Sequence, residues 1–475
     1  MDIHDTSKTK IIATIGPASA TEEKLREIIC AGIDVCRLNF SHGDYEGHQV
    51  IIDRIKKLNR EMGTQIAILA DLQGPKIRLG EMEDAVVVEK GASVIFTNES
   101  CKGTAEKMHI SYYDLPKDVR EGDSILIDDG KLEFKVVSTD GKNQIVAKAI
   151  HGGLISSRKG VNLPHTHLTV PSLTDKDIED VHFILDHDID WIALSFVRWA
   201  RDILELKKII RERNKNTLVL AKIEKPEALK EIDQIIEESD AVMVARGDLG
   251  VEVSFDQVPA IQKLIVNKCI LKSTPVVIAT QMLESMITNF RPTRAEANDV
   301  ANAVFDSADT VMLSGETSVG SYPVQAIASM QKIIDVAENA PFILNHEHLP
   351  DKESVSYIPD SVCYNACKMA DQSGAKAIVV FAAKALTTFR MASNRPKAPI
   401  YVFTEDEQMI RQIGLVWGTR AFYLDPNRDL GNAFEYSLKT LMHKQLIHNG
   451  DIVVHVSGIP VFDAQGVNLI KLSYV

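Results

Sequence analysis

Leu218-Val-Leu-Ala-Lys-Ile-Glu224 and Ala241-Val-Met-Val-Ala-Arg-Gly-Asp248 are the two stretches that decide the fold. Each is a short run of small and β-branched apolar residues that ends in charged residues. Such a run, bounded by polar sequence, is typical of a parallel strand buried on both faces. The sequence therefore predicts two neighbouring strands of one parallel sheet, with charged residues at their carboxyl ends.

These charged residues are predicted to converge. Alternate side chains of a strand share a face, so Lys222 and Glu224 point the same way, and Gly247 lets the backbone turn before Asp248. Two carboxylates with room left for water and substrate suit Mg²⁺. The ammonium suits a phosphoryl group in transfer, where catalysis is mostly charge stabilisation. A structural ion pair capping two strands is the alternative, and this pattern alone favours neither.

Strand-like and helix-like segments alternate on both sides of this pair. A capping box at Ser19–Glu22, with Ser19 as the N-cap, predicts the first helix at Glu23–Cys30. The other expected strands are Lys10–Ile15, Val35–Phe40, Ile66–Asp71, Trp191–Phe196, Pro275–Thr280 and Thr310–Ser314. The other expected helices are Tyr45–Arg60, Lys176–Asp186, Asp202–Arg213, Pro226–Glu237, Gln257–Lys272, Arg294–Phe305 and Pro323–Asn339. Eight such units predict a closed (β/α)₈ TIM barrel, whose chemistry lies at the carboxyl ends of its strands. That rule favours a functional role for Glu224 and Asp248.

Two further domains are expected. Short β runs and Gly-rich turns between Gly74 and His165, with hairpin signals at Asp128-Asp-Gly130 and Asp140-Gly141, predict an inserted small β-barrel lid. Pro341–Ile358 is predicted to be a linker to a C-terminal open-sheet α/β domain. The expected bounds are 1–73 with 166–343 for the barrel, 74–165 for the lid and 350–475 for the C-terminal domain.

Composition excludes several classes. The formal net charge of −13 argues against a nucleic-acid partner, because binding to phosphate backbones needs clustered Lys and Arg. We expect no membrane span, since no apolar run approaches about 18 residues. The first residues carry neither an apolar signal core nor an Arg-rich transit pattern. With six scattered cysteines and no Cys-x-x-Cys, these features predict a cytoplasmic protein with reduced thiols.

Backbone motifs that cradle phosphates, Gly-x-x-x-x-Gly-Lys-Ser/Thr and Gly-x-Gly-x-x-Gly after a strand, are absent from the sequence. Bound phosphates would then be held by side chains and metal. Candidates near strand ends and the lid are Arg37, Asn39, Ser41, His42, Arg78, Lys159 and Thr280. Two other patterns resemble metal sites, but simpler explanations are preferred. Cys363 and Cys367 are predicted to lie on a buried helix face, and His165 and His167 in a loop that rejoins the barrel.

Seven stretches match one enzyme family in order and spacing: Thr9–Ser19, Arg37–Gly43, Gly74–Arg78, Lys159–Pro164, Val242–Gly250, Ala279–Met286 and Arg291–Glu296. On these motifs the chain resembles the pyruvate kinase family along nearly its whole length. The resemblance implies transfer of the phosphoryl group of phosphoenolpyruvate to ADP, giving pyruvate and ATP. It also implies a barrel with a β lid after its third strand, a C-terminal α/β domain that is a possible site for a small-molecule allosteric effector, and a homotetramer.

The resemblance also implies roles for single residues, carried over motif by motif. Glu224 and Asp248 resemble the ligands of Mg²⁺ (or Mn²⁺), and Lys222 resembles the lysine that stabilises the moving phosphoryl group and the enolate. Arg37 resembles the phosphate-binding arginine, and Thr280 resembles the hydroxyl near the enolate carbon. The amides of Gly247 and Asp248 resemble donors to the substrate carboxylate. The residues that resemble nucleotide contacts are Asn39, His42, Arg78 and Lys159.

Two stretches depart from the family pattern. Many members have Thr-Lys-Gly-Pro-Glu after the third-strand aspartate and need K⁺, whereas this chain reads Asp71-Leu-Gln-Gly-Pro-Lys76. Lys76 would supply the positive charge and repel K⁺, so the chain resembles the potassium-independent branch, with Asn39, Ser41, Asp71 and Leu72 as a former or optional cation site. The stretch Ala382–Thr388 lacks most hydroxyls of the effector loop, which predicts weak or no activation by fructose 1,6-bisphosphate.

Two rival functions share the same residues. A barrel lyase or aldolase acting on enolpyruvate-type substrates would use Glu224 and Asp248 with Mg²⁺, but would not need the lid, Arg78 or Lys159. A non-catalytic binding or scaffolding protein on the same fold is the second rival. Turnover that depends on ADP separates the lyase from the kinase, and inactive protein that still binds Mg²⁺ and substrate would favour the second rival.

Overall fold

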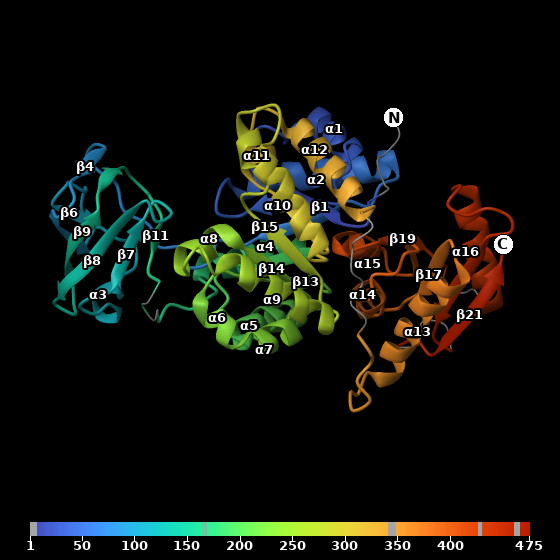
Figure 1. The fold of residues 1–475 in the computed structure, drawn as a ribbon. Coiled ribbons are helices and arrows are strands. Elements are labelled where there is room, and N and C mark those ends of the chain that lie inside the picture. The colour runs from blue at the N-terminus through green and yellow to red at the C-terminus, as the bar shows by residue number, and fades with distance from the viewer. Residues whose placement is uncertain (1–6, 165, 167–168, 341–347, 426–429, 460–465) are drawn as a thin grey trace.

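The computed structural model describes residues 7–164, 166, 169–340, 348–425, 430–459 and 466–475. In Figure 1 the lid, the barrel and the C-terminal domain lie in a row, with the barrel in the middle. His165, His167 and the first part of the expected linker lie outside the described residues. Among the residues described, no helix combines the length and apolar character that crossing a membrane requires.

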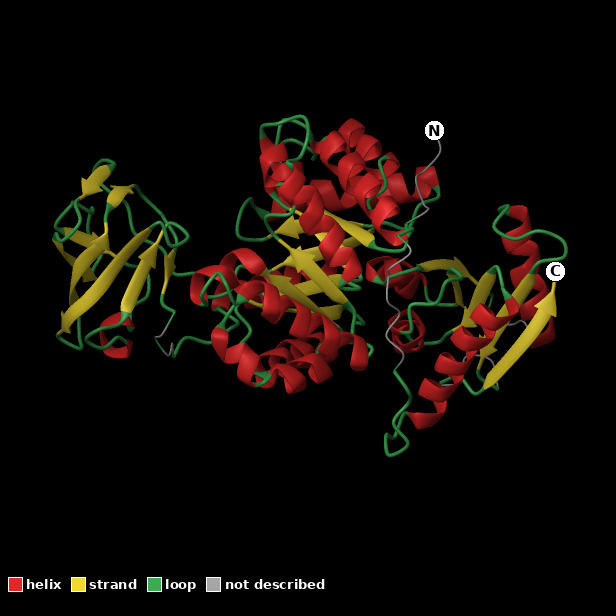
Figure 2. Cartoon of the chain, viewed as in Figure 1, coloured by secondary structure: helices red, strands yellow, loops and turns green. Residues whose placement is uncertain are grey.

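Eight parallel strands close into a barrel, as predicted, because β1 pairs with β16. Figure 2 shows these strands in yellow, surrounded by helices in red. The barrel strands are β1 (Lys10–Thr14), β2 (Val35–Asn39), β3 (Ala67–Asp71), β12 (Trp191–Leu194), β13 (Leu218–Ile223), β14 (Ala241–Ala245), β15 (Val276–Ala279) and β16 (Thr310–Leu313). Its helices are α1 (Glu22–Cys30), α2 (Tyr45–Met62), α4 (Asp175–Asp186), α5 (Ala200–Glu212), α6 (Pro226–Lys230), α7 (Ile232–Glu238), α8 (Arg246–Glu252), α9 (Val258–Leu271), α10 (Arg294–Phe305), α11 (Gly315–Ser318) and α12 (Pro323–Glu338), with the 3₁₀ turn η1 (Glu284–Ile287).

Four aspartates at the amino-terminal end of the barrel are used in the same way. The four aspartates directly precede alternate strands of the barrel, namely β2, β12, β14 and β16. Each accepts a hydrogen bond from a backbone N–H of the preceding barrel strand. The pairs are Asp34 with Ile11, Asp190 with Ile68, Asp240 with Val219 and Asp309 with Val276, at 2.8, 2.9 or 3.0 Å. The aspartates therefore tie neighbouring strands together at this end and satisfy backbone groups that the sheet leaves open.

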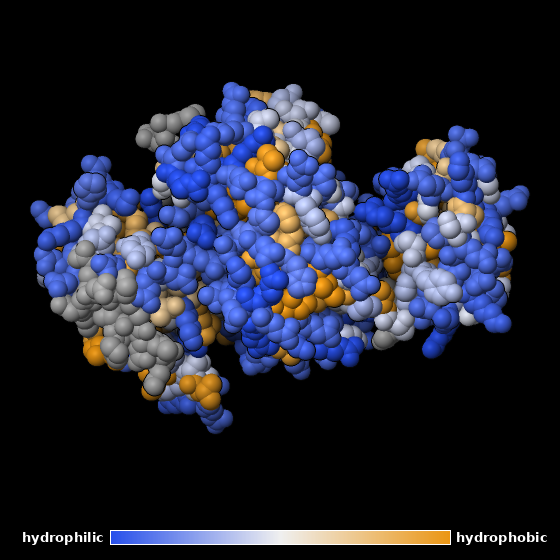
Figure 3. Space-filling view, turned by 180° about the vertical axis from the view of Figure 1, so that it is seen from behind, coloured by the Kyte–Doolittle hydropathy of each residue, from blue (hydrophilic) through white to orange (hydrophobic). Residues whose placement is uncertain are grey.

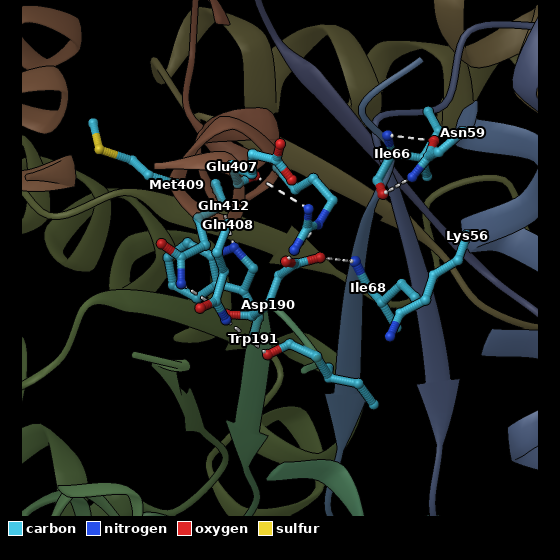
Figure 4. Close-up of polar contacts among 12 residues, drawn as sticks. Lys56, Asn59, Ile66, Ile68, Asp190, Trp191, Glu407, Gln408, Met409 and Gln412 are labelled. Carbon is cyan, nitrogen blue, oxygen red and sulfur yellow. Dashed lines mark hydrogen bonds and ion pairs between the residues drawn. The ribbon is translucent and has the colours of Figure 1, made fainter. Parts of the chain in front are cut away.

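The C-terminal domain docks on this end of the barrel. Arg411 donates to Asp190, and Trp191 donates its indole N–H to the carbonyl of Gln412 at 3.0 Å (Figure 4). Arg395 pairs with Asp309 at 2.9 Å. Apolar side chains inside the barrel, such as Trp191, belong to one buried cluster with those of the C-terminal domain. The two domains therefore share a continuous core.

The C-terminal domain has the open sheet that was predicted, and the sheet has five strands in the order β19-β18-β17-β20-β21. Its strands are β17 (Ala377–Phe381), β18 (Ile400–Thr404), β19 (Thr419–Tyr423), β20 (Ile452–Ser457) and β21 (Leu469–Tyr474), of which β21 runs antiparallel. Its helices are α13 (Tyr357–Ser373), α14 (Ala385–Ser393), α15 (Glu407–Gln412), the 3₁₀ turn η2 (Ile413–Leu415) and α16 (Leu430–His443).

The inserted β domain is also confirmed. Its strands form a six-stranded sheet, β11-β7-β8-β9-β5-β6, and a two-stranded ribbon of β10 and β4 around one hydrophobic core. They are β4 (Val86–Val88), β5 (Ser93–Thr97), β6 (Lys107–His109), β7 (Ser124–Ile127), β8 (Leu132–Thr139), β9 (Gln144–His151), β10 (Gly153–Ile155) and β11 (Val161–Asn162), with the short helix α3 (Leu115–Asp118). Asp128, Asp129 and Gly130 all have positive φ, as the predicted hairpin between β7 and β8 requires.

Three local predictions are wrong. Thr21, not Ser19, caps α1: its hydroxyl accepts from the amide of Lys24, whereas the hydroxyl of buried Ser19 accepts from the amide of Gly16 within the preceding turn. The single helix expected at Pro226–Glu237 is two helices, which break at Glu231. The C-terminal residues of the expected linker are already helical, because α13 begins at Tyr357.

Candidate active site

Lys222 lies at the centre of a buried polar cluster at the carboxyl ends of the barrel strands. Its Nζ lies 2.9 Å from Glu224 Oε1 and 3.2 Å from Asp71 Oδ1, and it donates to Ser195 Oγ at 2.7 Å. Glu224 accepts a second hydrogen bond, at Oε2, from the amide of Phe196 at 2.7 Å. Lys222 and Glu224 therefore share a face, as the alternation along the strand predicted.

Asp71 links this cluster to Arg37. Its Oδ2 accepts from Arg37 Nε at 2.7 Å and lies 2.6 Å from Nη2, while the other oxygen faces Lys222. Arg37 also donates through Nη1 to Thr14 Oγ1 at 2.9 Å. Both cations are thus fixed in place before any substrate binds, as electrostatic catalysis requires.

The charges of the cluster shift one another's pKa. Burial acts to raise the pKa of Asp71, but Lys222 and Arg37 outweigh it and lower the pKa. Burial acts to lower the pKa of Lys222, but Asp71 and Glu224 outweigh it and raise the pKa, so the lysine is an ammonium at neutral pH. The pKa of Glu224 is raised, by burial and by the negative charge of Asp248.

Glu224 and Asp248 fit a divalent cation of the magnesium type. Asp248 lies in the first turn of α8, is partly exposed, and has Oδ1 3.9 Å from Lys76 Nζ. Its charge helps to raise the pKa of Glu224, and a bound cation would offset this repulsion. The described residues contain no group of three or more His, Cys, Asp and Glu placed to hold a metal. Two carboxylates would suit Mg²⁺, which usually completes its shell with water and substrate oxygens.

Thr280 is held in a conformation that β-branched residues rarely adopt, with φ +72°. Its hydroxyl accepts from the amide of Gly247 at 2.7 Å, and its carbonyl accepts from Arg246 Nη2 at 2.7 Å. Arg246 is in turn paired with Asp299 at 2.7 Å. The predicted pair Gly247 and Thr280 is therefore in contact, and the surrounding bonds maintain the strain.

The candidate nucleotide residues are divided between the barrel and the lid. In the barrel, Asn39 Oδ1 accepts from the amide of Ser41 at 3.0 Å. Partial burial, together with the charges of Arg78, Lys76 and Arg37, lowers the pKa of His42. In the lid, Lys159 pairs with Asp128 at 2.8 Å, and Arg78 donates through Nη1 to the carbonyl of Arg158 at 3.3 Å. The two lid cations thus bond within the lid here.

A cleft of about 500 Å³, partly open solvent, lies where the lid joins the barrel. The residues that line it include Lys76, Asn162, Arg198, Lys225, Asp248 and Glu252. Figure 3, which views the molecule from behind, shows a notch between the lid and the barrel. Charged side chains of both domains therefore face one space beside Asp248.

Sequence reasoning missed Ser195, Thr14 and Arg246, which hold Lys222, Arg37 and Thr280 respectively. It placed Asp71 in a cation site, whereas the structure makes it the shared partner of Arg37 and Lys222. Each of these residues ends a barrel strand or directly follows one, so the rule that chemistry lies at the carboxyl ends could have pointed to them.

A closed (β/α)₈ barrel with paired carboxylates and fixed cations at its carboxyl end, beside a β lid, defines the class: a barrel enzyme for anionic substrates. The family model of the pyruvate kinase barrel domain matches residues 6–327, and that of the pyruvate kinase alpha/beta domain matches residues 360–473. The chain belongs to the pyruvate kinase family.

Individual relatives agree with this assignment. A pyruvate kinase of Corynebacterium glutamicum is 41% identical over 467 residues, 98% of this chain and 97% of the relative. One of Mycobacterium tuberculosis is 40% identical over 470 residues, 98% of each chain. A crystal structure of a pyruvate kinase from Cryptosporidium parvum matches with a TM-score of 0.92 and 34% identity, covering 98% of this chain and 96% of that one. The chain is thus an enzyme that transfers the phosphoryl group of phosphoenolpyruvate to ADP, and the lyase and non-catalytic alternatives are wrong.

Proposed function

We propose that Arg37, Lys222 and Thr280 carry the phosphoryl transfer, and that Glu224 and Asp248 hold the Mg²⁺ (or Mn²⁺) that it needs. The observation that carries this proposal is the fixed position of Lys222, which lies between the carboxylates of Asp71 and Glu224. The bound cation would neutralise charge on the phosphoryl oxygens and on the enolate.

The reaction has two steps. A terminal phosphate oxygen of ADP bonds to the phosphorus of phosphoenolpyruvate while the bond to the enol oxygen breaks, and the resulting enolate then takes up a proton at its methylene carbon. Arg37 binds the phosphate, the amides of Gly247 and Asp248 donate to the substrate carboxylate, and Lys222 offsets the charge that develops on the enol oxygen. Because its neighbours raise the pKa of Lys222, it keeps its proton. We therefore assign the delivery of a proton to carbon to the hydroxyl of Thr280, not to Lys222.

The nucleotide would bind between the barrel and the lid, against Asn39, His42, Arg78 and Lys159. Lys159 and Arg78 bond to lid partners in this structure, so they would exchange these partners for phosphate when ADP binds. A lid closed over the site would exclude water, which prevents loss of the phosphoryl group by hydrolysis.

We also propose that no monovalent cation is required. Lys76 places an ammonium 3.9 Å from Asp248. At the former cation site, Asn39 Oδ1 accepts from Ser41, Asp71 binds Arg37 and Lys222, and the carbonyl of Leu72 accepts from Ser195 at 2.7 Å. These oxygens already have partners within the protein, so K⁺ has little to add.

For the assembly we propose a homotetramer that responds weakly, or not at all, to fructose 1,6-bisphosphate. Thr387 and Thr388 are buried in α14, so the loop after β17 offers few hydroxyls to a phosphate. Another small-molecule effector of the C-terminal domain is compatible with this arrangement.

The direct test is pyruvate formation from phosphoenolpyruvate and ADP with Mg²⁺ in potassium-free buffer, followed by addition of K⁺. Full activity before K⁺ supports the site and the role of Lys76. Activity that appears only after K⁺ is added would support the reaction but contradict the proposed role of Lys76. Loss of activity without Mg²⁺ or Mn²⁺, recovered when either is added back, checks the cofactor.

A further inference from the structure

One buried carboxylate joins the lid to the segments that carry the proposed metal ligands. Glu252, the last residue of α8, is 3% exposed. Its Oε1 accepts from Asn162 Nδ2 at 2.9 Å and from Lys225 Nζ at 2.6 Å. Asn162 belongs to β11 of the lid, and Lys225 directly follows Glu224 at the end of β13. Glu252 therefore contacts two chain segments that are remote in sequence from its own.

Each of the three partners lies close along the chain to a residue of the proposed site. Asn162 and Lys159 are on the same short segment of the lid, and Glu252 and Asp248 are on the same seven-residue helix α8. Lys225 also lies 5.9 Å above the ring of Phe196, whose amide donates to Glu224 Oε2. A displacement of the lid at Asn162 would thus be passed to both carboxylates through a connected set of contacts.

Burial increases the energetic importance of the contacts that Glu252 makes with Asn162 and Lys225. Lys225 is 7% exposed, so the pair is almost completely shielded from water, and its two charges depend on each other. Glu252 Oε2 is buried without a hydrogen-bond partner among the described residues. Among the described residues, the hydrogen bonds of this carboxylate therefore come from Asn162 and Lys225, so a change at either donor alters how Glu252 is held.

We propose that Glu252 is a positioning residue, which couples the position of the lid, through Asn162, to the placement of the two metal-binding carboxylates. The proposal rests on the assignment of Glu224 and Asp248 as the metal ligands. A salt bridge that only stabilises the fold is the alternative, and in that case Asn162 in the lid would have no influence on the metal.

The test is Mn²⁺ binding to the full-length protein without substrate or nucleotide, measured from the electron paramagnetic resonance signal of free Mn²⁺. Asn162→Ala should raise the dissociation constant of Mn²⁺ at least about fivefold, the lower end of usual couplings between sites. The matched control is Asn143→Ala, since Asn143 Nδ2 donates to Glu99 Oε1 at 3.0 Å within the lid. The control should bind Mn²⁺ like the wild type.

A double-mutant cycle isolates the coupling. In a Glu252→Gln background, Asn162→Ala should have little further effect, because the contact that transmits lid position is already altered. If Glu252→Gln fails to fold, Asn162→Leu replaces it: this neutral side chain of similar size has no N–H to donate to Glu252, so it should weaken Mn²⁺ binding as Asn162→Ala does.

Asp248→Asn separates the two ways in which the idea can fail. Unchanged Mn²⁺ binding in Asp248→Asn would show that the metal assignment is wrong, and the coupling would fall with it. Weaker binding in Asp248→Asn but unchanged binding in both Asn162 variants would keep the metal site and overturn the role of Glu252.

Discussion

Lys222 Nζ lies 3.2 Å from Asp71 Oδ1, and the other oxygen of the same carboxylate holds Arg37. One side chain from β3 thus sets the distance between the two cations that we propose act on the phosphate and on the enolate. β3 and β13 are both neighbours of β12, so this relationship depends on how the strands pair and not on local sequence.

Lys222→Met should lower kcat by about 10²–10³-fold, which is the usual loss when a preorganised electrostatic group is removed. Steady-state assays of pyruvate formation measure this loss, and circular dichroism checks that the fold is kept. Lys131→Met is the control, because Lys131 pairs with Asp128 on the exposed surface of the lid. A kcat within tenfold of the wild type would contradict the assignment.

Asp71→Asn should destabilise the protein as well as slow it. The substitution keeps the shape but leaves Arg37 and Lys222 without their common anion, and breaking a buried ion pair costs about 3–5 kcal/mol. Scanning calorimetry should therefore show a lower melting temperature for this variant. Asp53→Asn changes an exposed aspartate whose one hydrogen bond among the described residues comes from Gln49, so the melting temperature of this variant should not move.

Much of this site could be predicted from sequence because a strand's period of two is simple. Lys222 and Glu224 meet as alternation required. The role of Asp71 could not be predicted, because it depends on the register that places Asp71 beside Ala193 of β12. Helix α8 was missed because its seven residues include Gly247 and Gly250, which are poor helix formers. Its packing beside the barrel must therefore override the low helix propensity of these residues.

Lys76→Glu should create a requirement for K⁺. The change replaces an ammonium near Asp248 with a carboxylate, so a monovalent cation would have to restore the lost charge. Initial rates with and without K⁺ measure the effect, and Lys76→Arg, which keeps the charge, should stay indifferent to K⁺. If Lys76→Glu is as active without K⁺ as with it, Lys76 does not take the place of the monovalent cation.

Arg246→Lys should impair the protonation step more than substrate binding. Arg246 holds the carbonyl of Thr280 and so maintains its φ of +72°. A small displacement of a reacting group costs up to about 10²-fold in rate. The exchange of deuterium from D₂O into the methyl group of pyruvate, followed by NMR, reports on the protonation step that we assign to Thr280, and it should fall. Exchange at the wild-type rate would show that Thr280 does not depend on Arg246.

Asp190 should make stability depend on pH, because it is buried where the C-terminal domain meets the barrel. Burial raises its pKa to about 6, although Arg411, the amide of Ile68 and Lys56 act in the opposite direction. In the unfolded chain the pKa of an aspartate is about 3.9. The folded protein therefore holds this proton more tightly. The stability that results is fully present below about pH 4, declines as the pH rises to about 6 and is then constant, a loss of about 3 kcal/mol in all.

Asp190→Asn lacks this dependence because its amide does not titrate. The melting temperature of the wild type minus that of Asp190→Asn should consequently fall between pH 4 and pH 7, as measured by calorimetry in matched buffers. Asp188→Asn is the control: Asp188 has positive φ, which asparagine tolerates, and its pKa is lowered by the hydrogen bond from Lys215. That shift places the titration of Asp188 below pH 4. The difference in melting temperature between the wild type and Asp188→Asn should therefore hardly change between pH 4 and pH 7. A flat or rising difference for Asp190→Asn would mean that Asp190 stays ionised in the folded protein at pH 4, and that the pair with Arg411 outweighs burial.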